Sequence, residues 1–189
     1  VMALTKSFSV LTGGPGTGKT AIVRLLTGIL QKRGETVLLA APTGRAARRL
    51  GEVCRMPAQT LHRLLALQVQ DDKVPDAAFW LSAEPLLCDT LIVDECSMID
   101  LFLFANLLSA VRPGTRVLLI GDADQLPSIG PGQVLRDILA SQTVTSTRLV
   151  EIYRQESHKL IVSNAHKILK GDSLELDLSL ESDFMFIDS

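Results

Sequence analysis

Eight consecutive residues near the start of the chain have the types and spacing needed to hold phosphate groups. They are Gly13, Gly14, Pro15, Gly16, Thr17, Gly18, Lys19 and Thr20. Glycines let backbone N–H groups approach phosphate oxygens, Lys19 supplies a positive charge, and Thr20 offers a hydroxyl ligand to a metal ion. A helix expected to begin near Lys19 would point its positive end at the same anion. This phosphate loop (residues 13–20) predicts that the chain binds a nucleoside triphosphate together with Mg²⁺, and a chance glycine-rich turn is the alternative.

A second candidate site lies where the apolar run 91–93 ends in Asp94 and Glu95. Asp94 is placed to hold Mg²⁺ through its water shell, opposite Thr20, so these two residues are the predicted metal site. Glu95 can polarise the water that attacks the terminal phosphate. Acids that merely cap the next helix are the alternative. The combination of Asp94 and Glu95 with the phosphate loop favours a catalytic role over helix capping. A base that can activate water favours hydrolysis over kinase chemistry.

Two further polar side chains are candidates for sensing the terminal phosphate. Gln125 follows the apolar run 117–120 and can hydrogen-bond to both the phosphate and the attacking water. Arg154 follows the run 147–152 and can stabilise charge that develops on a phosphate. A solvent-facing glutamine in a Gly-Asp turn and an ordinary surface arginine are the local alternatives. The predicted catalytic residues are Lys19, Asp94, Glu95, Gln125 and Arg154.

One segment is locally basic, although the chain carries a net charge of −2. Between residues 43 and 63, five arginines stand against a single acid, Glu52. Such a cluster can bind the phosphates of a nucleic acid, and a solvated helix face is the alternative. The residues predicted to contact nucleic acid are Pro42, Thr43, Gly44, Arg45, Thr60, His62 and Arg63. A helix cap at Thr60 and a merely exposed His62 are the simpler interpretations, and His62 lacks partners at metal-ligand spacing.

The elements that must position these residues alternate along the chain. Apolar runs without in–out alternation predict strands buried on both faces at 8–11, 37–41, 91–93, 117–120 and 147–152. Helical patterns lie between and after them at 19–32, 44–54, 61–67, 99–111, 133–140 and 157–170. This alternation predicts an α/β fold with a parallel sheet flanked by helices on both faces. Ligands of such sheets bind beyond the carboxyl ends of the strands, which is where the polar motifs occur.

Composition narrows the class of protein. The chain has 189 residues, 47% of them hydrophobic, which suits one α/β domain with a substantial core. No apolar run approaches the ~20 residues of a membrane span, and no signal-peptide pattern opens the chain. Three cysteines without C-x-x-C spacing argue against a disulfide framework. We therefore expect a cytoplasmic protein with no membrane partner.

Taken together, the motifs resemble those of superfamily 1 helicases, and most closely the RecD-like/TraA group of 5′→3′ DNA helicases (exodeoxyribonuclease V alpha-subunit-like). The matching segments, in the order of the family, are GGPGTGKT (13–20), APTGRAARRL (41–50), QTLHRLL (59–65), LIVDECSMID (91–100), VLLIGDADQLPSIGPGQVL (117–135) and EIYRQ (151–155). The resemblance implies a RecA-like P-loop NTPase fold. It also implies γ-phosphate contacts from Gln125 and Arg154, and binding of single-stranded DNA by 42–45 and 60–63. The other subunits of a nuclease–helicase complex are candidate partners.

The family pattern also predicts the domain organisation. Residues 1–171 are expected to form the first RecA-like motor domain. Residues 172–189 are expected to be an acidic tail leading toward a second motor domain, because no later family motif follows 151–155. The adenine-recognition motif expected upstream is likewise absent, so the chain is interpreted as half of a motor. The insert 68–85 occupies the position of a strand-separating hairpin in the family, and a plain surface loop is the alternative.

Two other functions compete with a DNA motor. A compact P-loop ATPase or nucleotide kinase would be complete at this length and would work without DNA. A nucleotide-gated binding module would use the site only as a switch. The arginine-rich segment and the residues Gln125-Leu126-Pro127 count against the compact enzyme. Replacing Glu95 with glutamine separates the motor from the switch, because a motor loses turnover and keeps ATP binding, whereas a pure switch loses little.

Overall fold

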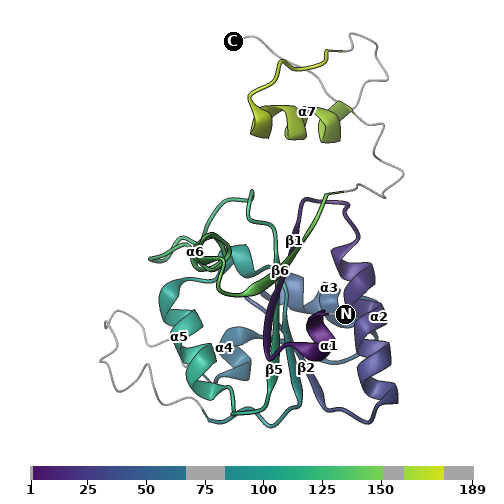
Figure 1. Cartoon of the computed structure of the whole chain (residues 1–189), viewed down its shortest axis with the longest axis vertical. Coiled ribbons are helices and arrows are strands. Elements are labelled where there is room, and N and C mark those ends of the chain that lie inside the picture. The colour runs from purple at the N-terminus through teal and green to yellow at the C-terminus, as the bar shows by residue number, and fades with distance from the viewer. Residues whose placement is uncertain (1, 67–83, 151–159, 177–189) are drawn as a thin grey trace.

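The computed structural model describes residues 2–66, 84–150 and 160–176, and its centre is a parallel sheet (Figure 1). The strands are β1 (Phe8–Gly13), β2 (Val37–Ala41), β3 (Ala58–Thr60), β4 (Thr90–Val93), β5 (Arg116–Gly121) and β6 (Thr145–Leu149). Their order across the sheet is β3-β2-β4-β5-β1-β6, and every neighbouring pair is parallel. All carboxyl ends therefore share one edge of the sheet, and β5 separates β1 from β4.

Helices cover both faces of this sheet, as the sequence predicted. The helical elements are α1 (Met2–Thr5), α2 (Lys19–Lys32), α3 (Gly44–Cys54), α4 (Leu61–Leu64), the 3₁₀ turn η2 (Cys96–Met98), α5 (Leu101–Ala110), α6 (Val134–Ser141) and α7 (Leu160–Lys170). In Figure 1, α2 and α5 lie on opposite sides of the strands. None of the helices placed in the described residues is long and apolar enough for a membrane crossing.

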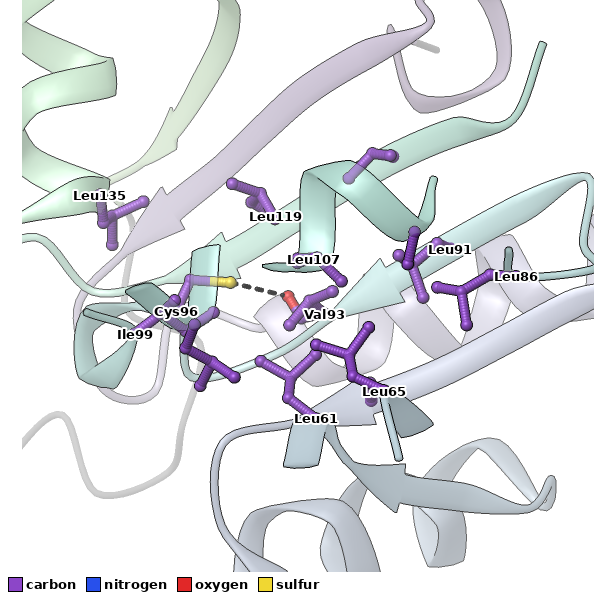
Figure 2. Packing of buried hydrophobic residues seen from close by; sticks show 14 of the residues in the cluster. Leu61, Leu65, Leu86, Leu91, Val93, Cys96, Ile99, Leu107, Leu119 and Leu135 are labelled. Carbon is purple, nitrogen blue, oxygen red and sulfur yellow. Dashed lines mark hydrogen bonds between the residues drawn. The ribbon is translucent and has the colours of Figure 1, made fainter. Parts of the chain in front are cut away.

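The core is divided into two clusters by the sheet. One packs α4, α5 and α6 against one face, and Figure 2 shows Leu107 of α5 beside Leu91 and Val93 of β4. The other packs α2 and α3 against the opposite face and contains Ile92 of β4. Because side chains alternate along a strand, consecutive residues of β4 serve opposite clusters. This double burial explains why the central strands are uninterrupted apolar runs.

Several predicted elements match the structure and others need correction. The strand predicted at 37–41 and the helices predicted at 19–32 and 44–54 coincide with β2, α2 and α3. The run 147–152 was predicted to be a strand buried on both faces, and this is wrong. Strand β6 lies at the edge of the sheet and exposes the side chains of residues 145–148. Residues 151 and 152 fall outside the described part of the chain.

The remaining differences are one short strand that was not predicted and the ends of two helices. Strand β3 was not predicted, because its three residues carry too little pattern to be detected. The helix predicted at 99–111 begins only at Leu101, since the Asp100 carboxylate caps it by accepting the Leu103 N–H at 2.8 Å. The helix predicted at 61–67 stops at Leu64. Most of the insert 68–85 lies outside the described residues.

Candidate nucleotide-binding site

The phosphate loop joins the end of β1 to the start of α2 and adopts a conformation that requires glycine. Gly16 and Gly18 have φ angles of 79° and 85°, in the left-handed region that L side chains avoid. Gly18 is also the N-cap of α2 and offers no side-chain cap. The first N–H groups of the helix are therefore left for a ligand, and an anion is the ligand that a helix N-terminus favours.

Lys19 lies folded back over the loop in this structure. Its ammonium group donates hydrogen bonds to the backbone carbonyls of Gly13 at 2.5 Å and Gly14 at 2.9 Å. Thr17 is buried and donates its hydroxyl to the same Gly14 carbonyl at 2.8 Å. Gly13 is itself tightly enclosed, because a Cβ there would lie 2.8 Å from the Leu149 carbonyl oxygen. The hydrogen bonds that Lys19 and Thr17 donate to the carbonyls of Gly13 and Gly14 therefore hold the loop in its shape.

The predicted acids follow β4, which is the third strand after β1 along the chain but is separated from β1 in the sheet only by β5. The Asp94 carboxylate accepts the Glu95 N–H at 2.9 Å, and the Asp94 N–H donates to the Ala40 carbonyl at 3.0 Å. Glu95 has a φ of 55°, a left-handed conformation that costs a non-glycine residue about 1–3 kcal/mol. Cys96 then hydrogen-bonds back to Val93, shown by the dashed line in Figure 2. The chain therefore changes direction in a tight turn directly after the two acids.

These two segments face one cleft of about 380 Å³, a volume suited to a small ligand. The residues lining it are 15–21 of the phosphate loop and α2, together with Arg49, Asp94, Glu95 and Gln125. The structure therefore brings together most of the residues predicted for nucleotide, metal and catalysis. Their convergence at the carboxyl edge of the sheet agrees with the general rule for open parallel sheets.

Burial in the cleft disfavours the charged forms of its two acids. Loss of solvent raises the pKa of Asp94 above its ordinary value, and the nearby cations Lys19 and Arg49 only partly oppose this. Burial likewise raises the pKa of Glu95, and the negative charge of Asp94 raises it further. Two carboxylates are thus held close together with too little compensating charge. A cation bound between them would favour the charged form of both carboxylates.

The donor set fits Mg²⁺, which takes few protein ligands and keeps several waters alongside phosphate oxygens. Thr20 and Asp94 line the same cleft and supply a hydroxyl and a carboxylate. Across residues 2–66, 84–150 and 160–176 there is no group of three or more His, Cys, Asp or Glu side chains that could form an all-protein metal cage. The metal role of Thr20 and Asp94 stays a prediction.

Gln125 reaches the cleft from the loop after β5, and this loop is held by a residue that the sequence did not single out. Arg136 of α6 donates to the Ala123 carbonyl at 2.8 Å and to the Gln125 carbonyl at 3.2 Å. Asp122 is buried and its carboxylate accepts the Asp124 N–H at 3.1 Å. These contacts hold the loop that carries Gln125, and the role of Gln125 stays a prediction. Arg154 lies outside the described residues.

The residues predicted to contact nucleic acid meet at the ends of two neighbouring strands. β2 and β3 are paired with Ala41 opposite Thr60, so the segments 42–45 and 60–63 leave the sheet side by side. Gly44, Arg45, His62 and Arg63 are exposed. The hydroxyls of Thr43 and Thr60 act as helix N-caps, each accepting a backbone N–H at 3.2 Å. The simpler interpretation of Thr60 as a cap is therefore confirmed, and its DNA contact stays a prediction.

Arg49 is the residue of the cleft that the motif-by-motif interpretation missed. In the sequence it is one of several arginines on α3, and no local signal separates it from Arg48. The helical period provides the only clue, because it turns the two side chains about 100° apart. Only the packing of α3 beside α2 shows that Arg49 faces the cleft.

Comparison with known proteins agrees with this geometry. A family model described as an AAA domain matches residues 1–185. The ATP-dependent RecD2 DNA helicase of Deinococcus radiodurans is 43% identical over 87% of this chain and 22% of its own length. The RecBCD enzyme subunit RecD of Mycobacterium tuberculosis is 39% identical over 90% of this chain and 33% of its own length. The chain thus spans about a fifth to a third of these relatives.

Solved structures give the same fold. Pif1 helicase from Candida albicans superposes with a TM-score of 0.64 at 23% identity, covering 90% of this chain and 42% of that one. Pif1 helicase from Bacteroides, in complex with ADP-AlF3 and single-stranded DNA, superposes with a TM-score of 0.59 at 24% identity, covering 89% and 44%. The predicted RecA-like P-loop NTPase fold is confirmed.

Proposed function

The chain belongs to the AAA domain family, and from this premise we propose that it is the ATP-binding motor domain of a DNA helicase of the RecD kind. The resemblance to RecD-like helicases seen in the sequence is confirmed by the identities to RecD2 and RecD. The observation that carries the proposal is the single cleft in which the phosphate loop faces Asp94, Glu95 and Gln125.

The proposed roles follow from the position of each group in the cleft. The backbone N–H groups of the loop and Lys19 would bind the phosphates, which requires Lys19 to leave the carbonyls of Gly13 and Gly14. Thr20 and Asp94 would hold Mg²⁺, whose charge when bound stabilises negative charge on the phosphates. Glu95 would accept a proton from the attacking water.

The DNA side of the proposal rests on the paired strand ends of β2 and β3. Single-stranded DNA would run across the segments 42–45 and 60–63, where backbone groups and exposed arginines can contact its phosphates. Gln125 and Arg154 would report the presence of the terminal phosphate. The proposal includes a first motor domain at 1–171, a tail at 172–189 that leads to a second motor domain, and a cytoplasmic location. Other subunits of a nuclease–helicase complex are the proposed partners.

The competing functions receive less support. RecD2 and RecD, which match 87% and 90% of this chain, are named as a DNA helicase and as a subunit of RecBCD, and neither name favours a compact kinase. A pure nucleotide switch does not require a strained glutamate beside the metal-binding acid, since only hydrolysis uses a base there.

Replacing Glu95 with glutamine in the whole protein tests the catalytic part of the proposal. We expect ATP binding, measured by calorimetry, to be retained and turnover to fall by about 10²–10⁴-fold. Glu52→Gln is the matched control, because Glu52 is exposed on α3 and outside the cleft. An E95Q protein with normal turnover would exclude Glu95 as the base.

A second measurement tests the division into two motor domains. Residues 1–189 alone are expected to bind ATP weakly and to hydrolyse it slowly, with or without single-stranded DNA. Binding to DNA should be independent of sequence and should weaken as salt is raised. Vigorous DNA-stimulated hydrolysis by residues 1–189 alone would contradict the need for a second domain.

A further inference from the structure

Arg49 occupies a position in the cleft that none of the predicted roles uses. It comes from α3 and lines the same cleft as the phosphate loop, Asp94 and Glu95. Its positive charge acts on both carboxylates and favours their charged forms, as does that of Lys19. Arg49 is therefore a second cation at the end of the cleft where the two acids lie.

No ion pair within 4 Å engages Arg49 among residues 2–66, 84–150 and 160–176. The neighbouring Arg48 behaves differently, because its guanidinium binds the Glu52 carboxylate at 2.9 Å on the outer face of the same helix. Both arginines are exposed, so burial does not distinguish them. A long cation that faces a polar cleft and has no carboxylate partner is available to an anionic ligand.

We propose that Arg49 binds the terminal phosphate of the nucleoside triphosphate, as a second phosphate-binding cation beside Lys19. This inference rests on the proposed function, in which Glu95 marks the end of the triphosphate that is hydrolysed. A guanidinium offers several donors in a planar fork and suits phosphate oxygens better than a single ammonium group does. A nucleoside diphosphate lacks the group that Arg49 would contact.

The position of α3 gives this contact a structural consequence. The helix begins at Gly44, capped by Thr43, at the end of β2 where DNA contact is proposed. Arg49 lies little more than one turn further along the same helix. One rigid element therefore extends from the strand ends proposed for DNA to the wall of the nucleotide cleft.

The test compares the binding of ATP and ADP, each with Mg²⁺, to the whole protein and its variants by calorimetry. Arg49→Ala is expected to weaken ATP binding by about tenfold or more while leaving ADP binding nearly unchanged. Arg49→Lys should restore part of the preference for ATP, because it keeps the charge but loses the fork. Arg48→Ala is the matched control and should alter neither affinity, since Arg48 lies outside the cleft.

The outcomes separate this inference from the proposed function. Equal weakening of ATP and ADP in R49A, or no weakening of either, would overturn the terminal-phosphate contact while the proposed function stands. A wild-type whole protein that binds neither nucleotide would overturn both. Thermal unfolding of each variant shows whether it is folded, and Arg49→Gln, which keeps most of the side-chain stem, replaces R49A if the alanine variant unfolds.

Discussion

Removing the negative charge of Asp94 is expected to stabilise the fold while it abolishes function. The carboxylate is partly buried and accepts one backbone hydrogen bond, from Glu95 N at 2.9 Å. Within the described ranges, no lysine, arginine or histidine forms an ion pair with it. Asp94→Asn keeps the size of the side chain and the oxygen that accepts this hydrogen bond. It removes a charge that burial disfavours and that also repels Glu95.

The sign of the pH dependence follows from the raised pKa of Asp94. In the interval between the ordinary pKa and the higher pKa in the folded protein, the folded state binds more protons than the unfolded state. The free energy of unfolding therefore falls as pH rises through that interval, and the deficit remains at neutral pH. The Asp94→Asn variant does not lose this stability. Its free energy of unfolding should therefore exceed that of the wild type at pH 7 and equal it below about pH 4.

We expect the free energy of unfolding of Asp94→Asn to exceed that of the wild type by about 1 kcal/mol at pH 7, which is the usual size of a single stabilising substitution. For a domain of this size this corresponds to a rise of about 2–4 °C in melting temperature. Thermal unfolding of the metal-free and nucleotide-free chain, recorded from pH 3.5 to 8, measures both quantities. Calorimetry with ATP and Mg²⁺ should show that the same variant binds nucleotide poorly.

Asp89→Asn is the matched control, because Asp89 also accepts a backbone N–H, from Thr36 at 2.7 Å, but is exposed at the opposite edge of the sheet. It should give no gain in melting temperature. An Asp94→Asn chain that is less stable than wild type at pH 7 would refute the reasoning. A gain of equal size at pH 3.5 and pH 7 would refute it as well, since the gain would then not come from charge.

Three further substitutions test the packing around the site. Leu107→Ala removes a fully buried side chain and should lower the free energy of unfolding in urea by about 2–5 kcal/mol, whereas a loss below 1 kcal/mol would contradict its core position. Gly13→Ala would place a Cβ 2.8 Å from the Leu149 carbonyl oxygen, so melting temperature and ATP affinity should both fall; an unchanged affinity would show that the loop can shift. Thr43→Ala removes the cap on the Ala46 N–H and should cost about 1 kcal/mol in thermal unfolding, and Thr43→Ser should restore it.

Much of the fold could be predicted because its signals are local. The helix of 19–32 follows a glycine-rich turn, and the helix of 44–54 begins after a threonine that caps it, so both were found with their correct ends. The central strands were found because burial on both faces makes them continuously apolar. The edge strand β6 was judged wrongly, since an apolar run does not reveal whether another strand or helix will cover it.

The candidate residues of the site were likewise identified from the sequence alone. Glycines, Lys19 and Thr20 stand together in one loop, and Asp94 with Glu95 directly follows a strand, so each motif is complete within a few residues. The tertiary structure decided which of these motifs share a cleft. The strand order places β5 between β1 and β4, and the packing of α3 beside α2 brings Arg49 to the cleft and leaves Arg48 outside. Strand order and helix packing depend on contacts between residues far apart in the chain, which no local pattern records.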